Sequence, residues 1–379
     1  MREGWEDKLL KDICSVFGRI GFRGYTKADF VSTPDNGAIT LSPSNIIGGE
    51  LSCDKCSYVS WEKYYQSPEI MVFPGDILLV KTASIGKCAL VRSLPHEATI
   101  NPQFVVLKEI KVNHHYLTYF LQSPIAQKKF QEFAIGAAVP TFSQKKLEGL
   151  IVPTPSLPEQ QRIVDILDRE FAKIDALKAN AEKSLQAAKD LFQATLKKEL
   201  EPKEGWKTTT LGQSLKLTSG DNLTAKNLVS GPFPVYGGNG IMGYHNQYNL
   251  DGQNLIVGRV GALCGNVRLV SGKIWYTDNA FLVHDKQNAF YLPFLSLVLT
   301  NANLRQFATQ AAQPVVSNAS MKDARLSFPE AIEEQKRIVP LLDDLNDKCN
   351  TLQQNYQKTL TLCDDLKQSL LRKAFNGEL

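Results

Sequence analysis

The same sequence pattern occurs twice, and this internal duplication restricts the possible folds more than any other feature of the chain. Three anchors recur in the same order in the two halves of the 379 residues, namely Glu3-Gly4-Trp5 and Glu204-Gly205-Trp206, residues 136–143 and 310–317, and residues 158–164 and 333–339. One such match could arise by chance, but three in order indicate a repeated structural unit. We therefore expect two similar globular domains, each followed by the same kind of second segment.

Each half begins with a mixed globular part. Apolar runs broken by Gly and Pro predict strands at 77–80, 88–91 and 104–107 in the first half, and at 255–257, 267–270 and 280–283 in the second. Longer helical stretches follow at 116–133 and 292–308. This mixture predicts an α+β fold for both domains.

Each half then ends in a long helix with one narrow, mainly apolar stripe. The stripe residues are spaced by threes and fours in two series: Ile163, Leu167, Phe171, Ile174, Leu177, Ala181, Leu185, Ala188, Leu191 and Thr195, and then Ile338, Leu342, Leu345, Cys349, Leu352, Tyr356, Leu360, Cys363, Leu366 and Leu370. This spacing is typical of a coiled-coil seam, although plain packing or dimerisation produces it too.

Connectivity predicts how the two helices pair. The first helix leaves the first domain and runs through Glu201-Pro202-Lys203 into the second, so the second helix must return along the first to bury its stripe. We predict an antiparallel coiled coil with one domain at each end and a pseudo-twofold axis through its middle. The expected boundaries are 1–157 for the first domain, 158–200 for the first spacer helix, 201–330 for the second domain and 331–379 for the second spacer helix.

Composition indicates a cytoplasmic protein without a membrane span. No apolar run approaches the ~20 residues that a span needs, and the N-terminus has no apolar signal region. Seven scattered cysteines are typical of unpaired thiols in a reducing compartment. Lys and Arg exceed Asp and Glu slightly in both globular parts, by 17 to 15 in residues 1–155 and by 11 to 8 in residues 201–330. This excess permits phosphate contacts, and solvated surfaces alone also produce it.

The sequence does not support a catalytic site. Asn101-Pro102-Gln103-Phe104 approaches the Asn-Pro-Pro-aromatic tetrapeptide of amino-methyltransferases, but Gln replaces the second Pro and no Gly-rich cofactor loop follows a strand. Cys53 and Cys56 form a lone CxxC where a structural zinc needs four ligands, and His114-His115 has no Glu at helical spacing. No phosphate-binding loop ends in Gly-Lys-Ser/Thr. We expect no cofactor, no metal and no catalytic residue.

The order of these segments resembles the specificity subunits of type I restriction–modification systems. The resemblance rests on the Gly-Trp opening of each half, the Glu-Gln-(Gln/Lys)-Arg-Ile-Val helix starts and the closing run 371–379, and it covers essentially the whole chain. It implies a non-catalytic subunit that reads a bipartite double-stranded DNA target with one target-recognition domain per half-site and the helices as a ruler. It also implies two modification (adenine methyltransferase) subunits as partners, and restriction subunits in the full complex. Four residues lie off the strict stripe, and we expect them in the methyltransferase docking surface: Phe192, Leu196, Leu362 and Leu371.

Side chains that distinguish bases or hold phosphates gather on two loops of each domain. In the first domain the candidates lie on a Gly-rich loop and on a hairpin between two strands: Arg19, Arg23, Tyr25, Thr26 and Lys27, and then Lys81, Thr82, Ser84 and Lys87. In the second domain the matching candidates are Asn222, Thr224, Lys226, Asn227, Tyr236 and Asn239, and then Arg259 and Asn266. Two rival interpretations stay open: a self-contained DNA methyltransferase or nuclease, and a protein-binding adaptor without nucleic acid.

Overall fold

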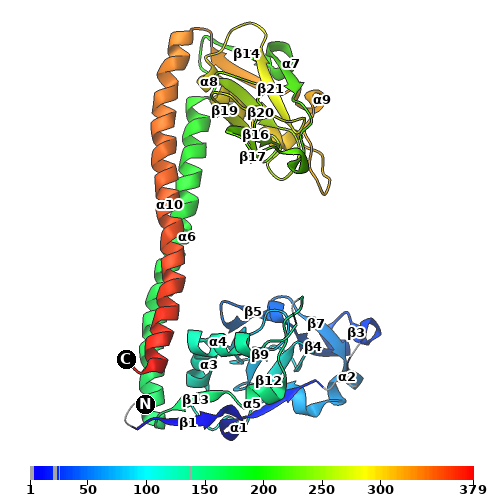
Figure 1. The fold of residues 1–379 in the computed structure, drawn as a ribbon, viewed down its shortest axis with the longest axis vertical. Coiled ribbons are helices and arrows are strands. Elements are labelled where there is room, and N and C mark those ends of the chain that lie inside the picture. The colour runs from blue at the N-terminus through cyan, green and yellow to red at the C-terminus, as the bar shows by residue number, and fades with distance from the viewer. Residues whose placement is uncertain (1–3, 20–23, 25, 137) are drawn as a thin grey trace. The chain divides into compact units, whose positions relative to one another are not determined.

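The computed structural model describes residues 4–19, 24, 26–136 and 138–379, which form two compact units. Unit 1 comprises Met1–Asn180 with Thr359–Leu379, and unit 2 comprises Ala181–Lys358. Each long helix therefore contributes one part to each unit (Figure 1). Among the described helices, none is both long and apolar enough to cross a membrane.

Unit 1 contains a central four-stranded sheet of order β10-β9-β12-β2, an outer five-stranded sheet of order β3-β7-β4-β11-β8, and two two-stranded pairings, β1-β13 and β5-β6. The strands are β1 (Glu6–Leu9), β2 (Ser15–Gly18), β3 (Phe30–Val31), β4 (Gly37–Leu41), β5 (Ile46–Ile47), β6 (Glu50–Leu51), β7 (Ser57–Ser60), β8 (Met71–Val72), β9 (Ile77–Val80), β10 (Cys88–Leu90), β11 (Ala98–Ile100), β12 (Phe104–Lys108) and β13 (Ile151–Thr154). The short helices are α1 (Leu10–Ile13), α2 (Trp61–Tyr65), α3 (His114–Gln122), α4 (Pro124–Phe133) and α5 (Gln144–Glu148).

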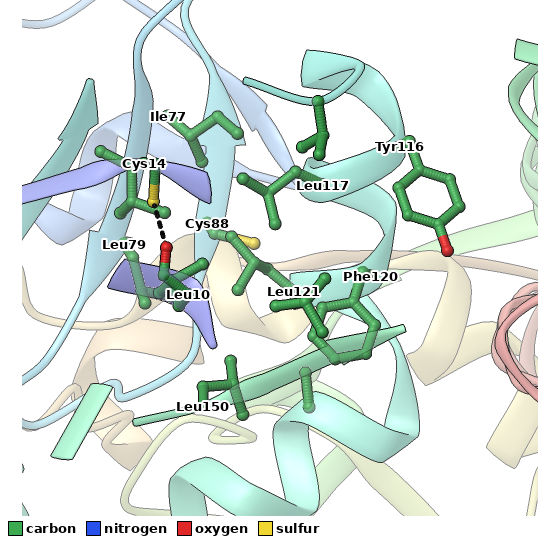
Figure 2. Close-up of a cluster of buried hydrophobic side chains, with 14 of the residues drawn as sticks. Leu10, Cys14, Ile77, Leu79, Cys88, Tyr116, Leu117, Phe120, Leu121 and Leu150 are labelled. Carbon is green, nitrogen blue, oxygen red and sulfur yellow. Dashed lines mark hydrogen bonds between the residues drawn. The ribbon is translucent and has the colours of Figure 1, made fainter. Parts of the chain in front are cut away.

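Strand β9 explains where the core of unit 1 lies. Ile77 and Leu79 belong to one apolar cluster, which includes residues of α3 and α4, whereas Leu78 and Val80 belong to a second cluster with residues of the outer sheet. Successive side chains of a strand point to opposite faces, so both faces of β9 are buried and its sequence is apolar throughout. Figure 2 shows the first cluster, where Leu117 and Leu121 of α3 lie over the sheet.

Unit 2 repeats this plan with a smaller outer sheet. Its central sheet has the order β19-β18-β21-β15, its outer sheet β17-β16-β20, and its two-stranded pairing β14-β22. The strands are β14 (Trp206–Thr210), β15 (Leu215–Ser219), β16 (Phe233–Gly237), β17 (Gly240–His245), β18 (Asn254–Gly258), β19 (Val267–Val270), β20 (Trp275–Tyr276), β21 (Ala280–Asp285) and β22 (Arg325–Pro329). The short helices are α7 (Leu211–Ser214), α8 (Leu292–Asn301) and α9 (Asn318–Met321).

The pairing pattern confirms the predicted repeat and the α+β class. In the central sheets β2, β9, β10 and β12 of unit 1 correspond to β15, β18, β19 and β21 of unit 2, with antiparallel neighbours throughout. In the outer sheets β4 runs parallel to β11, and β16 runs parallel to β20 in the same way. The six strands predicted from apolar runs are all present. The helical stretch predicted at 116–133 is two helices, because Ser123 caps the second one and Pro124 begins it.

The two long helices, α6 (Leu157–Glu199) and α10 (Ile332–Asn376), pack against each other in antiparallel fashion within each unit. In unit 1 the Nζ of Lys178 lies 2.8 Å from the carboxylate of Asp364, and the Nζ of Lys367 lies 2.6 Å from that of Asp175. From Asp175 to Lys178 the chain advances three residues along α6, while their partners go back three residues along α10, from Lys367 to Asp364. The two helices therefore run in opposite directions. In unit 2, Leu196 of α6 shares a buried cluster with Ile338 and Leu342 of α10.

Part of the predicted seam is wrong. Leu177, Leu191, Leu352 and Leu366 are exposed by 56%, 51%, 42% and 48%, whereas Ile163, Leu167, Ile338 and Leu342 are buried. A straight helix of 3.6 residues per turn drifts by about 20° per heptad relative to a strict seven-residue repeat, and a single partner helix covers only a narrow strip. Ala181, Ala188, Cys349 and Cys363, which lie on the same stripe, are buried, so the contact between the helices follows a narrower line than the predicted stripe.

The predicted off-stripe surface also needs correction. Leu196 is 0% exposed and belongs to the core cluster of unit 2, against which Phe192 also packs. Leu371 is 2% exposed and belongs to the core cluster of unit 1. Of these four residues, Leu362 is the one that is strongly exposed, at 55%. Near its ends each long helix is covered by a globular domain as well as by its partner helix, so residues on the flank of the stripe are buried there.

A buried glutamine joins each long helix to its globular domain. Gln335, at the start of α10, accepts a hydrogen bond from the backbone N–H of Tyr291 at 2.7 Å and donates to the carbonyls of Ala289 and Pro329, both at 2.9 Å. Gln160, at the start of α6, accepts from the N–H of Asn113 and donates to the carbonyl of Pro155, both at 2.8 Å. The repeated Glu-Gln motif therefore has a structural role.

Candidate nucleic-acid interface

In unit 1 the β9–β10 hairpin lies against the segment that precedes α5. The backbone N–H of Ala83 donates to the carbonyl of Pro140 at 2.8 Å, and that of Phe142 donates to the carbonyl of Lys81 at 3.1 Å. The hydroxyls of Thr82 and Thr141 are 2.8 Å apart. Two sequence features that were recognised separately, the hairpin and the second repeat anchor, are thus one structural feature.

Unit 2 has the same arrangement. The N–H of Gly261 donates to the carbonyl of Pro314 at 2.9 Å, and the N–H of Val316 donates to the carbonyl of Arg259 at 2.9 Å. Gly261 has a φ of +98°, and the equivalent residue of unit 1, Ala83, has a φ of +65°. Both hairpins therefore turn through a left-handed residue, which glycine adopts readily and alanine adopts at a cost.

A third segment, the turn before β12 or β21, completes the arrangement. Asn101 accepts from the N–H of Gln103 at 2.9 Å, and Gln103 accepts through its carbonyl from the N–H of Lys81 at 2.8 Å. In unit 2 the Oγ1 of Thr277 accepts from the N–H of Asn279 at 3.3 Å. The side chain of Asn101 thus closes a turn, and threonine does the same in the second copy.

We call these three segments the loop cluster of each unit, defined as residues 81–87, 101–103 and 138–142 in unit 1 and residues 259–266, 277–279 and 310–316 in unit 2. Six residues predicted to contact DNA lie on the loop clusters: Lys81, Thr82, Ser84, Lys87, Arg259 and Asn266. Asn239 is beside the cluster of unit 2, because its Oδ1 accepts from the N–H of Leu263 at 3.0 Å.

The remaining candidates lie elsewhere. Arg19 is only 6% exposed and donates from Nε to the carbonyl of Ile100 and from Nη2 to the hydroxyl of Thr99, both at 3.2 Å, so its guanidinium joins two sheets inside the domain. Thr26 and Lys27 are exposed, and Thr26 is bound to Asp29. Arg23 and Tyr25 lie outside the described residues. In unit 2, Tyr236 packs against an apolar cluster, whereas the candidates in the segment before β16 are exposed: Asn222, Thr224, Lys226 and Asn227.

Two cationic side chains of the loop clusters, those of Lys81 and Arg259, are partly buried against the domain surface. Lys81 is half-buried, and the loss of solvent around its amine lowers its pKa. Arg259 donates from Nη1 to the carbonyl of Asp278 at 3.2 Å, and its guanidinium carbon lies 5.5 Å from the ring centre of Phe281. These contacts orient the guanidinium without neutralising it.

Sequence reasoning missed a hollow of about 270 Å³ beside the loop cluster of unit 2. Its lining includes the amides of Asn239, Asn279 and Gln313, the glycines 237, 238, 240 and 261, and the apolar residues Ile241, Met242 and Val260. None of these lining residues is ionisable. The four glycines were a signal in the sequence, but only the fold brings Asn279 and Gln313 together with them.

The alternative chemical sites have local explanations. The thiol of Cys56 donates to the carbonyl of Cys53 at 3.3 Å, and burial raises the pKa of Cys56 to about 11. One ring nitrogen of His114, Nδ1, lies 2.7 Å from the carbonyl oxygen of Gly75. Within residues 4–19, 24, 26–136 and 138–379, no group of three or more His, Cys, Asp or Glu side chains is placed to hold a metal ion.

Comparison with known proteins gives consistent matches over the whole chain. The Type I restriction enzyme EcoprrI specificity subunit of Escherichia coli is 31% identical over 307 residues, which cover 74% of this chain and 74% of that protein. The StySPI specificity subunit of Salmonella potsdam is 23% identical over 432 residues, covering 100% of this chain and 89% of that protein.

Solved structures agree in fold. A chain from a study of complex assembly and conformational transition in the type I R-M system matches with a TM-score of 0.77 at 16% identity, covering 100% of this chain and 99% of its own. The HsdS subunit from Thermoanaerobacter tengcongensis matches with a TM-score of 0.53 at 16% identity, covering 100% and 98%.

The family model described as the type I restriction modification DNA specificity domain matches this chain twice, over residues 2–187 and 203–362. Each match includes one complete loop cluster. The chain therefore belongs to the type I restriction modification DNA specificity family.

Proposed function

We propose that this chain is the non-catalytic specificity subunit of a type I restriction–modification complex, and that each of its two domains reads one half of a bipartite double-stranded DNA target. The observation that carries the proposal is the repeated loop cluster. The same main-chain hydrogen bonds build it twice, while its side chains differ between the two copies. Two domains that share the same backbone hydrogen bonds but carry different loop side chains are suited to recognise two different half-sites.

We further propose that two methyltransferase subunits bind the helical region, and that restriction subunits join this complex in the cytoplasm. Exposed leucines on α6 and α10 support a protein-binding role for the helices: Leu177, Leu191, Leu341, Leu352, Leu362 and Leu366. A partner that covers these side chains would remove their apolar surface from water, which favours association. The domain and spacer boundaries given by the sequence, 1–157, 158–200, 201–330 and 331–379, remain part of this proposal.

The direct test is DNA binding and methylation by the chain assembled with its methyltransferase subunit. We expect specific binding of a two-part site, with methylated adenines in both parts. Substitution of the loop cluster of unit 1 should abolish recognition of one part, and substitution of that of unit 2 should abolish recognition of the other. Methyl transfer or DNA cleavage by the purified chain alone would favour a self-contained enzyme. Absence of salt-sensitive DNA affinity would favour a protein-binding adaptor, because phosphate contacts release counterions and protein contacts do not.

The ruler role of the helices has its own test. Seven residues inserted in both helices, after Asn180 in α6 and after Lys358 in α10, should keep the apolar pattern in register and lengthen each helix by about 10 Å. We expect the spacer of the recognised site to grow by about three base pairs at ~3.4 Å each. Recognition that keeps the original spacer would contradict the ruler.

A further inference from the structure

Lys81 and Arg259 occupy the same place in the two units. The N–H of Lys81 donates to the carbonyl of Gln103 at 2.8 Å, and that of Arg259 donates to the carbonyl of Asn279 at 2.9 Å. Their own carbonyls accept from Phe142 and Val316, at 3.1 and 2.9 Å. The backbone therefore fixes both residues in equivalent positions, where the hairpin meets the other two segments of the loop cluster.

Each of these positions carries a cation that no carboxylate of the described residues neutralises. The Nε of Arg259 is buried and has no hydrogen-bond partner within the described part of the chain. Lys81 is half-buried, and a Cβ built on Gly18 would lie 3.3 Å from its Nζ. Gly18 thus leaves the room that the amine occupies. Withdrawing a charge from water without a counter-charge is unfavourable, and finding it at the same place in both copies indicates an anion supplied from outside the chain.

Other positions of the loop clusters differ in chemistry between the copies. Pro140 and Pro314 accept equivalent hydrogen bonds from Ala83 and Gly261, so the residues before them, Val139 and Gln313, are equivalent as well. Val139 is 57% exposed and offers an apolar contact alone. Gln313 lines the hollow of unit 2 together with Asn279, and both amides present one donor and one acceptor group. Glutamine and asparagine pair with the major-groove edge of adenine in this way, whereas valine cannot.

We propose that Lys81 and Arg259 hold equivalent DNA phosphates in the two half-sites, and that Gln313 and Asn279 read an adenine in the half-site of unit 2. This inference rests on the proposed function. It assigns the equivalent cations to affinity. It assigns sequence preference to Gln313, whose counterpart in unit 1 is Val139, together with the neighbouring amide of Asn279. These two roles have different experimental signatures.

The phosphate role is tested with the complex of this chain and its methyltransferase subunit, using a duplex that carries the complete target. Arg259→Met and Lys81→Met should each weaken binding about tenfold on all DNA sequences alike. Each should also reduce the magnitude of the negative slope of log affinity against log salt concentration by about 0.9, as loss of one phosphate contact requires. Arg259→Lys should keep the slope. Lys207→Met is the matched control, since Lys207 is an exposed cation of unit 2 paired with Glu330, at 3.1 Å, on the β14–β22 sheet. An unchanged slope in both Met variants would overturn the phosphate assignment.

The base-reading role is tested on duplexes in which each base pair of the target is replaced in turn. Gln313→Val should reduce discrimination at one adenine of one half-site on the order of tenfold, leave the other half-site unchanged and leave the salt slope unchanged. Asn279→Ala should affect the same or an adjacent base pair, and Gln253→Val, an exposed position of the same unit, should affect none. A uniform loss over all positions, or no loss, would overturn the assignment. Wild-type complex that lacks any two-part specificity would instead refute the proposed function itself.

Discussion

Replacing the buried glutamine at the start of α10 should destabilise unit 2 more than replacing its counterpart in unit 1. Gln335 is 0% exposed and makes three hydrogen bonds, to the N–H of Tyr291 and to the carbonyls of Ala289 and Pro329. Gln335→Met keeps most of the volume and leaves three backbone groups without a partner. An unsatisfied buried group costs about 1–3 kcal/mol. Because Tyr291 and Ala289 are half-buried and water reaches them in part, we take the lower limit for each, about 3 kcal/mol together.

The apolar methionine side chain offsets part of this loss, by about 1 kcal/mol. The expected net loss is therefore about 2 kcal/mol for Gln335→Met. Gln160 makes two such bonds, so Gln160→Met should cost about 1 kcal/mol by the same reasoning. Gln354→Met, at an exposed position of α10, should cost nothing measurable.

Native-state hydrogen exchange on the full chain measures these losses one amide at a time, without requiring two-state unfolding. The amide of Tyr291 should exchange about thirtyfold faster in Gln335→Met, since each 1.4 kcal/mol is a factor of ten. The amide of Asn113 should respond to Gln160→Met alone. If the amide of Tyr291 exchanges as slowly in Gln335→Met as in Gln354→Met, the side chain of Gln335 does not stabilise this part of unit 2, and the reasoning is refuted.

Three further predictions concern the hairpins and the helices. Ala83→Gly should stabilise unit 1 by about 1 kcal/mol, because alanine at φ +65° has an unfavourable left-handed backbone conformation. Gly261→Ala should destabilise unit 2 by at least as much. Thermal unfolding of each variant measures both changes, and a lower melting temperature for Ala83→Gly or a higher one for Gly261→Ala would contradict the prediction. Lys81→Met should stabilise the free chain near neutral pH while weakening DNA binding. The folded-state pKa of Lys81 is lowered by desolvation, so the penalty of its charge is fully present below the folded pKa and disappears as the pH rises toward the unfolded value of 10.5; the stability gain should therefore shrink at alkaline pH in denaturant titrations, and a gain independent of pH would speak against this origin. Leu352→Gln should reduce co-purification of the methyltransferase subunit at least fivefold without changing the melting temperature of the chain. Thr351→Gln, at the exposed neighbouring position, should leave co-purification unchanged. Equal co-purification with both variants would argue against docking at Leu352.

The sequence was sufficient to predict the elements whose apolar pattern is regular. The duplicated anchors predicted two equivalent units, and the apolar runs at 77–80 and 255–257 predicted central strands, because a strand buried on both faces has no polar alternation to obscure it. The outer sheets were not predicted. Three of their strands, β3, β8 and β20, are two residues long, too short to carry a periodic signal.

The loop clusters show where sequence reasoning ends. Lys81 and Arg259 were among the predicted contacts because each follows a recognisable strand. Gln313 was not, since its position depends on a hydrogen bond from Gly261 to Pro314 across more than fifty residues of chain. Arg19 was assigned to DNA because it follows glycine in a loop, but the fold brings the carbonyl of Ile100 to its Nε and buries it. Residue type predicts what a side chain can bind, and tertiary contacts decide what remains available.

The duplication itself explains how a chain of this kind can change its target without losing its fold. Main-chain groups make the hydrogen bonds that join the segments of each loop cluster, as in the pairs Ala83–Pro140 and Gly261–Pro314, so these bonds do not depend on the side chains at positions 139 and 313. The strands of the central sheets contribute apolar residues to the core of each unit. The buried Gln160 and Gln335 bind the N–H groups of Asn113 and Tyr291, which follow β12 and β21, whereas one segment of each loop cluster precedes these strands. Substitutions at positions 139 and 313 therefore change the exposed chemistry of a reader at little cost in stability. Exchanging residues 138–142 for 312–316 should transfer a base preference from one half-site to the other, and a chimera that folds but keeps both original preferences would show that the sequence is read elsewhere.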